Sequence, residues 1–161
     1  MKQGKVIWFD PSINLGKLSE ISPRTLSQHL GMEWVDMGAD YLRMRMPVDS
    51  RTHQPYGLLH GGASCALAET IGSIASFLVI DASKYACVGL EINANHVRSV
   101  RSGWVTAKAS PLHLGKTTHI WDIKITDEAE KLVCVSRLTV AILDRAAAGL
   151  EMNIQPEPAQ D

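Results

Sequence analysis

The longest apolar stretch of the chain covers residues 58–80 and predicts a helix. Within it, only His60 and Glu69 can carry a charge. A helix that is apolar on nearly all sides is normally enclosed by other parts of the protein. A lone carboxylate on such a helix is costly unless it is partnered, neutralised or used. The pattern therefore predicts a long central helix that carries one acidic residue, which is a candidate for a functional role.

Alternating apolar and polar residues on both sides of this stretch predict strands. Before it, residues 32–37 and 41–46 form a predicted hairpin that turns at residues 38–40. After it, four more strands are predicted, over residues 85–97, 103–112, 118–126 and 132–143. Strands that are not separated by crossover helices pair in antiparallel fashion. We therefore expect an α+β fold in which a curved antiparallel sheet wraps around the central helix.

The remaining segments define the expected limits of the domain. Ser22 and Pro23 predict the start of a short helix that ends near Gly31. Residues 49–57 are polar and predict a loop that leads into the central helix. Residues 1–144 are therefore expected to form a single domain, and residues 145–161 a flexible C-terminal tail.

Composition narrows the possible classes of function. The chain has 161 residues, of which 45% are hydrophobic and 20% charged, as in an ordinary globular domain. The net charge of −1 offers no general attraction to nucleic acid or to an acidic membrane surface. A membrane-spanning role for residues 58–80 is disfavoured because a central carboxylate is costly in lipid. Three widely spaced cysteines suit neither a disulfide framework nor a metal site, which favours a reducing cytoplasm.

Glu69 is the strongest candidate for chemistry. At helical spacing, small residues share its side of the helix: Cys65, Gly72, Ser73 and Ser76. Bulky apolar residues lie opposite and are expected to face the core: Leu67, Ile71, Ile74 and Leu78. The narrow side can admit another chain or a ligand. Glu69 is thus interpreted either as a general base or nucleophile in a cleft with little water, or as an acid hydrogen-bonded within an oligomer interface.

The predicted start of the helix is a second candidate site. The first amides of a helix are unpaired and favour negative charge, so the Gly61 N–H could stabilise the oxyanion of an attacked carbonyl. Gln54 is a candidate second donor. His60 could orient a leaving group or only cap the helix, and Gly61 with Gly62 could be only a tight turn. No dinucleotide, P-loop or metal-binding pattern is present, so no metal is expected.

These residues belong to one longer motif. From Gln54 the sequence reads Gln-Pro-Tyr-Gly-Leu-Leu-His-Gly-Gly, and Glu69 follows nine residues after His60. The motif resembles that of the hotdog-fold acyl-CoA thioesterases, and in particular their 1,4-dihydroxy-2-naphthoyl-CoA hydrolases and enterobactin-pathway proofreading thioesterases. The likeness extends over about residues 7–143. It implies a hotdog fold and the hydrolysis of acyl- or aroyl-CoA thioesters to a carboxylate and coenzyme A.

The resemblance also implies roles for the site residues. Glu69 would be the nucleophile or the general base, and Gln54 and the Gly61 amide would hold the thioester oxygen. His60 would contact the thioester region, and Ser73 would assist from the opposing helix. The family's assembly is a homotetramer, a dimer of dimers with two active sites at each dimer interface. No cofactor is implied, because coenzyme A enters only as part of the substrate.

Recognition of coenzyme A carries over by resemblance to three segments. The residues concerned are Gly89, His96, Val97, Arg98, Ser99, His113, Leu114, Gly115, Lys116, Thr117 and Thr118. Val97 and Ser99 stand where close members of the family have His and Pro, and Lys116 stands where Arg is usual. These departures leave the nucleotide contacts and the acyl preference open. Two alternatives remain: a hydrolase that clears misacylated carrier proteins, and a non-catalytic module that binds acyl-CoA.

Overall fold

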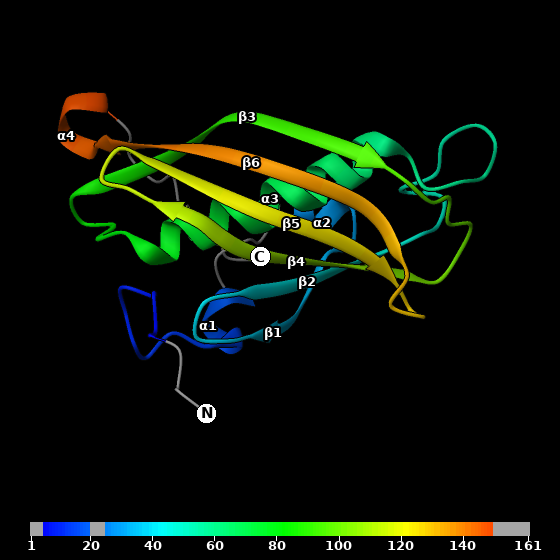
Figure 1. The fold of residues 1–161 in the computed structure, drawn as a ribbon, viewed down its shortest axis with the longest axis horizontal. Coiled ribbons are helices and arrows are strands. Elements are labelled where there is room, and N and C mark those ends of the chain that lie inside the picture. Colours follow the sequence, from blue (N-terminus) through cyan, green and yellow to red (C-terminus); the bar gives the residue numbers. More distant parts are fainter. Residues whose placement is uncertain (1–4, 20–24, 150–161) are drawn as a thin grey trace, which may run out of the picture.

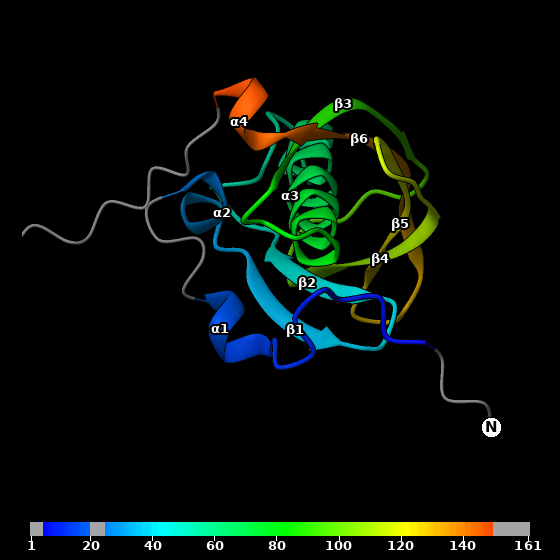
Figure 2. The same ribbon diagram turned by 90° about the vertical axis from the view of Figure 1, so that its left-hand side faces the viewer.

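A computed structural model describes residues 5–19 and 25–149, and its central feature is a six-stranded antiparallel sheet curved around one long helix (Figures 1 and 2). The elements, in chain order, are α1 (Leu15–Ser19), α2 (Leu26–His29), β1 (Glu33–Met37), β2 (Leu42–Pro47), α3 (Gly61–Val79), β3 (Tyr85–His96), β4 (Trp104–Leu114), β5 (Thr118–Asp127), β6 (Leu132–Asp144) and α4 (Arg145–Ala148). The strand order is β1-β2-β4-β5-β6-β3, which leaves β1 and β3 at the edges. The expected α+β hotdog architecture is confirmed.

The predicted central helix is α3, which begins three residues later than the apolar stretch. His60 is its N-cap, and the His60 Nδ1 accepts a hydrogen bond of 2.8 Å from the Gly62 N–H. Leu67 and Ile71 are fully buried against the sheet. Figure 2 looks along α3 and shows strands on several sides of it. By length and composition α3 could cross a membrane, but half of its apolar window is buried inside the protein.

The predicted strands all form, and each ends within two residues of its expected limit. The hairpin between β1 and β2 closes where expected, with the Gly38 N–H donating to the Tyr41 carbonyl at 3.0 Å. The turn between β5 and β6 is closed by the Asp127 N–H, which donates to the Lys131 carbonyl. Period-2 alternation was reliable here because β2 to β6 each place one face against α3, and β1 packs beside α1.

The short helices differ from the sequence-based expectation. The expected helix from Ser22 is represented only by α2, and Ser22 and Pro23 lie outside the described residues. Gly31 follows α2 with a φ of +66°, a left-handed conformation that suits the expected stop. The expected tail begins with α4, whose first turn is capped by the Asp144 carboxylate. Neither α4 nor α1 has enough residues to produce a helical period in the sequence.

The expected division of α3 into two faces is partly wrong. Gly72 and Ser76 were assigned to the side of Glu69, but both are buried against the sheet. The Ser76 Oγ accepts a hydrogen bond of 2.7 Å from the Trp121 Nε1, and a Cβ on Gly72 would lie 3.2 Å from the Ile123 Cδ1. These small residues let the curved sheet approach the helix closely. A helical wheel cannot distinguish small residues that pack against a sheet from small residues on an open side of the helix.

His119 on β5 gives the fold a pH-dependent stability. Its side chain is 2% exposed, and its Nδ1 has no hydrogen-bond partner among the described residues. Burial lowers the pKa of His119 below its ordinary value, a backbone hydrogen bond with Gly115 opposes this, and the nearby His113 lowers it further. Below about pH 6.5 the unfolded chain binds a proton here that the folded chain does not, so the free energy of unfolding falls as the pH falls.

We therefore expect acid to destabilise the protein through His119. The midpoint temperature of thermal unfolding should decrease when the pH is lowered from about 7.5 to about 5.5, the range in which histidines titrate. The variant His119→Gln, which cannot gain a proton, should show a smaller fall, as measured by circular dichroism. Equal falls in both proteins would show that other groups cause the effect.

Candidate active site

Two of the predicted segments meet in one cavity of about 350 Å³ at the start of α3. Its lining residues are Gln54, Leu58, Leu59, Gly61, Ser64, His96, Val97, Arg98, Ser99 and Val133. The loop before α3 therefore contacts the segment after β3, although about 40 residues separate them in the chain. No Asp or Glu lines this cavity.

Backbone hydrogen bonds fix the loop that carries Gln54. The Gln54 N–H donates to the Leu58 carbonyl at 2.8 Å, and the Gly57 N–H donates to the Gln54 carbonyl at 2.9 Å. Gly57 has a φ of +69°, which favours glycine at this tight turn. The Leu59 N–H donates to the Val100 carbonyl at 2.8 Å and ties the loop to the segment after β3. The Pro-Tyr-Gly turn thus holds Gln54 in place beside the start of α3.

Two hydrogen-bond donors are available to a carbonyl oxygen in this cavity. The Gln54 Oε1 accepts from the Tyr56 N–H, which leaves the side-chain NH₂ group of Gln54 free to donate. In the hydrogen-bond network of the described residues, the Gly61 N–H has no partner. Both residues line the cavity and both groups are free to donate, which an oxyanion site requires.

The two histidines near the cavity have different surroundings. His60 is exposed, does not line the cavity, and uses its Nδ1 to cap α3, so in the neutral ring its Nε2 carries the proton. His96 lines the cavity, and its Nε2 lies 2.8 Å from the position that a Cβ on Gly61 would occupy. The family resemblance connects His96 only with coenzyme A, and nothing in the spacing of the motif indicates its position beside Gly61.

Glu69 lies on α3 away from this cavity. It is half-buried and not fully buried as the apolar stretch suggested. The Glu69 Oε1 accepts a hydrogen bond of 3.0 Å from the Ser73 Oγ, one turn further along the same helix. The carboxylate lies against the backbone of Gly89 on β3, where a Cβ would overlap its Oε1. Ser73 and Gly89 therefore fix the position of this carboxylate.

Within one chain, Glu69 does not reach the two donors. It follows Gly61 by eight residues, which is about 12 Å along a helix. Glu69 is also absent from the lining of the cavity. A single chain therefore contains the acid and the oxyanion donors in separate places.

The predicted coenzyme A segments are also separated. The turn 113–118 joins β4 to β5, and Thr118 pairs with Ala141 on β6. His96 pairs with Cys134 at the other end of the same strand. Cys134 and Ala141 are seven residues apart on β6, which corresponds to about 23 Å. The turn 113–118 and the segment 96–99 thus occupy opposite ends of the sheet.

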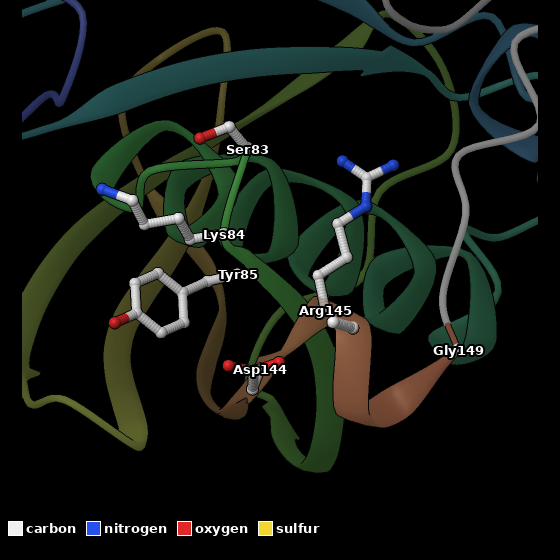
Figure 3. A pocket seen from close by; sticks show the side chains of 7 residues that line it. Ser83, Lys84, Tyr85, Asp144, Arg145 and Gly149 are labelled. Atoms are coloured by element: carbon white, nitrogen blue, oxygen red, sulfur yellow. The ribbon is translucent and has the colours of Figure 1, made fainter.

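A larger hollow of about 810 Å³ lies at the end of the sheet where β3 begins, lined by residues that include Ser83, Lys84, Tyr85, Asp144 and Arg145 (Figure 3). Its cations are already engaged: the Lys84 Nζ pairs with the Asp81 carboxylate at 2.9 Å, and the Arg145 Nη1 donates to the Ala82 carbonyl at 2.8 Å. It contains none of the predicted site residues. In the described part of the chain, no group of three or more His, Cys, Asp or Glu residues could hold a metal ion.

Comparison with known proteins identifies similar sequences and structures. The sequence model of the "Thioesterase superfamily" matches residues 56–134. The chain is 50% identical over 133 residues to a putative esterase, PA1618, of Pseudomonas aeruginosa, covering 83% of this chain and 92% of that protein. It is 49% identical over 138 residues to the 1,4-dihydroxy-2-naphthoyl-CoA hydrolase of Escherichia coli, covering 86% of this chain and all of that protein. It is 48% identical over 131 residues to the proofreading thioesterase EntH of Cronobacter turicensis, covering 81% and 95% of the two chains.

Solved structures agree with these sequence matches. A crystal structure of a mutant of thioesterase PA1618 superimposes with a TM-score of 0.83 at 48% identity, covering 86% of this chain and 99% of that chain. The thioesterase HI1161 of Haemophilus influenzae superimposes with a TM-score of 0.82 at 47% identity, covering 86% and 95% of the two chains.

Proposed function

Because the chain belongs to the thioesterase superfamily and is a thioester hydrolase, we propose that it cleaves acyl or aroyl thioesters of coenzyme A at a site shared by two copies of the chain. This proposal rests on one observation, the separation of the oxyanion donors from the acid within a single chain. The donors of Gln54 and Gly61 face a cavity without an acid, and the carboxylate of Glu69 is fixed elsewhere on α3. A relative that hydrolyses 1,4-dihydroxy-2-naphthoyl-CoA supports an aroyl-CoA substrate.

The exposed edge of β3 supports the pairing of two copies. An edge strand presents unpaired backbone groups, and Leu90 and Val88 on β3 are 62% and 38% exposed. Gly89 and His96 are seven residues apart on this strand. If two β3 strands pair antiparallel about a twofold axis between these residues, Gly89 lies beside His96 of the partner subunit. Glu69, which contacts Gly89, then approaches Gly61 of the partner subunit.

The same pairing would complete the coenzyme A site. It brings the start of β3 in one chain towards the end of β3 in the other. The turn 113–118 of one chain therefore approaches the segment 96–99 of the partner subunit. Arg98 and Lys116 would then supply positive charge for the phosphates. We extend the proposal to a homotetramer built from two such dimers and to a cytoplasmic location, which its three free cysteines support.

The proposed chemistry needs only groups of this chain and water. The Gly61 N–H and the Gln54 side chain donate to the thioester oxygen. Either Glu69 takes a proton from a water molecule that attacks the carbonyl carbon, or the Glu69 carboxylate attacks, expels the thiolate and forms an anhydride that water then cleaves. Both routes yield a carboxylate and the thiol of coenzyme A. Ser73 holds one carboxylate oxygen and leaves the other for the reaction.

The substrate assignment can be tested by measuring thiol release. We expect a higher kcat/KM for aryl, β-keto or straight-chain CoA thioesters than for the same acyl groups on a carrier protein. The reverse preference would favour removal of misacylated groups from carrier proteins, as the name of the relative EntH suggests. Tight binding of acyl-CoA without thiol release from any substrate would contradict the proposal and indicate a binding module.

A further inference from the structure

We infer that His96 is a catalytic residue that donates a hydrogen bond to the thioester oxygen, in addition to the Gly61 amide. This inference rests on the proposed function, because it concerns the same cavity. It differs from the role in coenzyme A recognition that the family resemblance implies for His96. The difference matters because a donor to the oxyanion acts on the rate of the reaction, whereas a nucleotide contact acts on binding.

The position of the imidazole ring carries the inference. His96 is the last residue of β3 and lies opposite the buried Cys134 of β6. From the point where a Cβ on Gly61 would lie, the His96 Nε2 is 2.8 Å away, the Cδ2 3.2 Å and the Cε1 3.3 Å. The Nε2 edge of the ring therefore faces the first residue of α3. His96 and the free N–H of Gly61 therefore face the same cavity, with the Nε2 beside Gly61.

Other groups near the cavity are less suited to this role. The His60 ring is committed to capping α3 and does not line the cavity. The Arg98 Nε already donates to the Leu132 carbonyl at 3.2 Å. Among the residues that line the cavity, His96 is the only one with an imidazole. It therefore adds a donor to those of Gly61 and Gln54.

The chemistry of this donor predicts which kinetic constant changes. A neutral imidazole with a proton on Nε2 can donate without transferring that proton. The hydrogen bond strengthens as negative charge develops on the oxygen, so its loss lowers kcat and leaves KM nearly unchanged. A nucleotide contact would instead change KM for a CoA thioester and have no effect on a pantetheine thioester, which lacks the nucleotide.

The test compares His96→Ala and His96→Gln on matched CoA and pantetheine thioesters. We expect His96→Ala to lower kcat by about 10²-fold on both substrates, with KM within about threefold of the wild type. His96→Gln keeps a side-chain N–H donor and should recover part of the rate. His29→Ala, at an exposed position on α2, serves as the control and should retain full activity. Circular dichroism should show that all variants fold, since His96 is exposed at the end of an edge strand.

Each other outcome has a defined meaning. A rise in KM for the CoA thioester alone would overturn the inference and return His96 to nucleotide binding. An unchanged kcat would also overturn it. If the wild type cleaves neither kind of thioester, the proposed function itself has failed, and the variants need not be compared.

A second measurement uses the contact between the two residues. A Cβ on Gly61 would displace the His96 ring, so Gly61→Ala should lower kcat more in the wild type than in the His96→Ala background. Such non-additivity would show that Gly61→Ala lowers kcat partly by moving the His96 ring, and so that the position of this ring matters for the rate. Fully additive effects on kcat would count against the inference.

Discussion

Replacing Glu69 with Gln is expected to lower kcat on a CoA thioester by about 10²- to 10⁴-fold, the usual contribution of a general base, or by more if Glu69 is the nucleophile. Gln has nearly the same shape as Glu but cannot accept a proton or attack a carbonyl carbon. Ser73 can still donate to its amide oxygen, so the local structure should persist. Thermal unfolding of the variant should therefore resemble that of the wild type, and the loss should be confined to kcat.

A matched control is Glu128→Gln, which removes the same charge from an exposed position in the turn between β5 and β6. We expect this variant to be as active as the wild type in an assay of thiol release. If Glu69→Gln also retained wild-type turnover, Glu69 could be neither the base nor the nucleophile. A folded Glu69→Gln variant with wild-type KM and reduced kcat would agree with the proposal.

The two possible roles of Glu69 can then be separated by a single turnover in ¹⁸O-labelled water. If Glu69 forms an anhydride that water cleaves at the Glu69 carbonyl, the label enters the enzyme and the first carboxylate released is unlabelled. If Glu69 activates water, the first carboxylate carries the label. Mass spectrometry of the product and of the peptide that contains Glu69 measures both quantities.

The sequence predicted those parts of the fold in which one face of an element is buried. Strands β2 to β6 have a period because each packs on α3, and Leu67 and Ile71 of that helix are buried as expected. The roles of Gly72 and Ser76 could not be predicted in this way, because a small residue on a helix suits either an open face or a tightly packed sheet. The curvature of the sheet decided between them, and it depends on strand residues that lie 45 to 66 positions further along the chain.

The candidate site, too, could be predicted only where a local pattern in the sequence defines it. Gln54 and Gly61 could be predicted because one short motif contains both residues and their turn. The position of His96 beside Gly61 depends on how β3 packs against α3, and no local pattern records that packing. The fixed position of Glu69 against Gly89 is also a tertiary contact between helix and edge strand. Both contacts involve β3, the strand through which we propose that two chains meet.

Mixing two inactive variants is expected to restore activity if the site is shared between two chains. One variant carries Glu69→Gln and the other Gln54→Ala, so each homodimer has two defective sites. In a mixed dimer one site carries both substitutions, and the other combines Glu69 of one chain with Gln54 of its partner. Random reassortment makes half of the dimers mixed, so about a quarter of the wild-type activity should return.

Co-expression of the two variants with different affinity tags would isolate the mixed dimers, whose rate per dimer should be about half that of the wild type. Each variant purified alone serves as the baseline. If each chain contained a complete site, mixing would give only the mean of the two baselines. That outcome would contradict a shared site and would require a path by which Glu69 and Gly61 of one chain, about 12 Å apart along α3, act on the same carbonyl group.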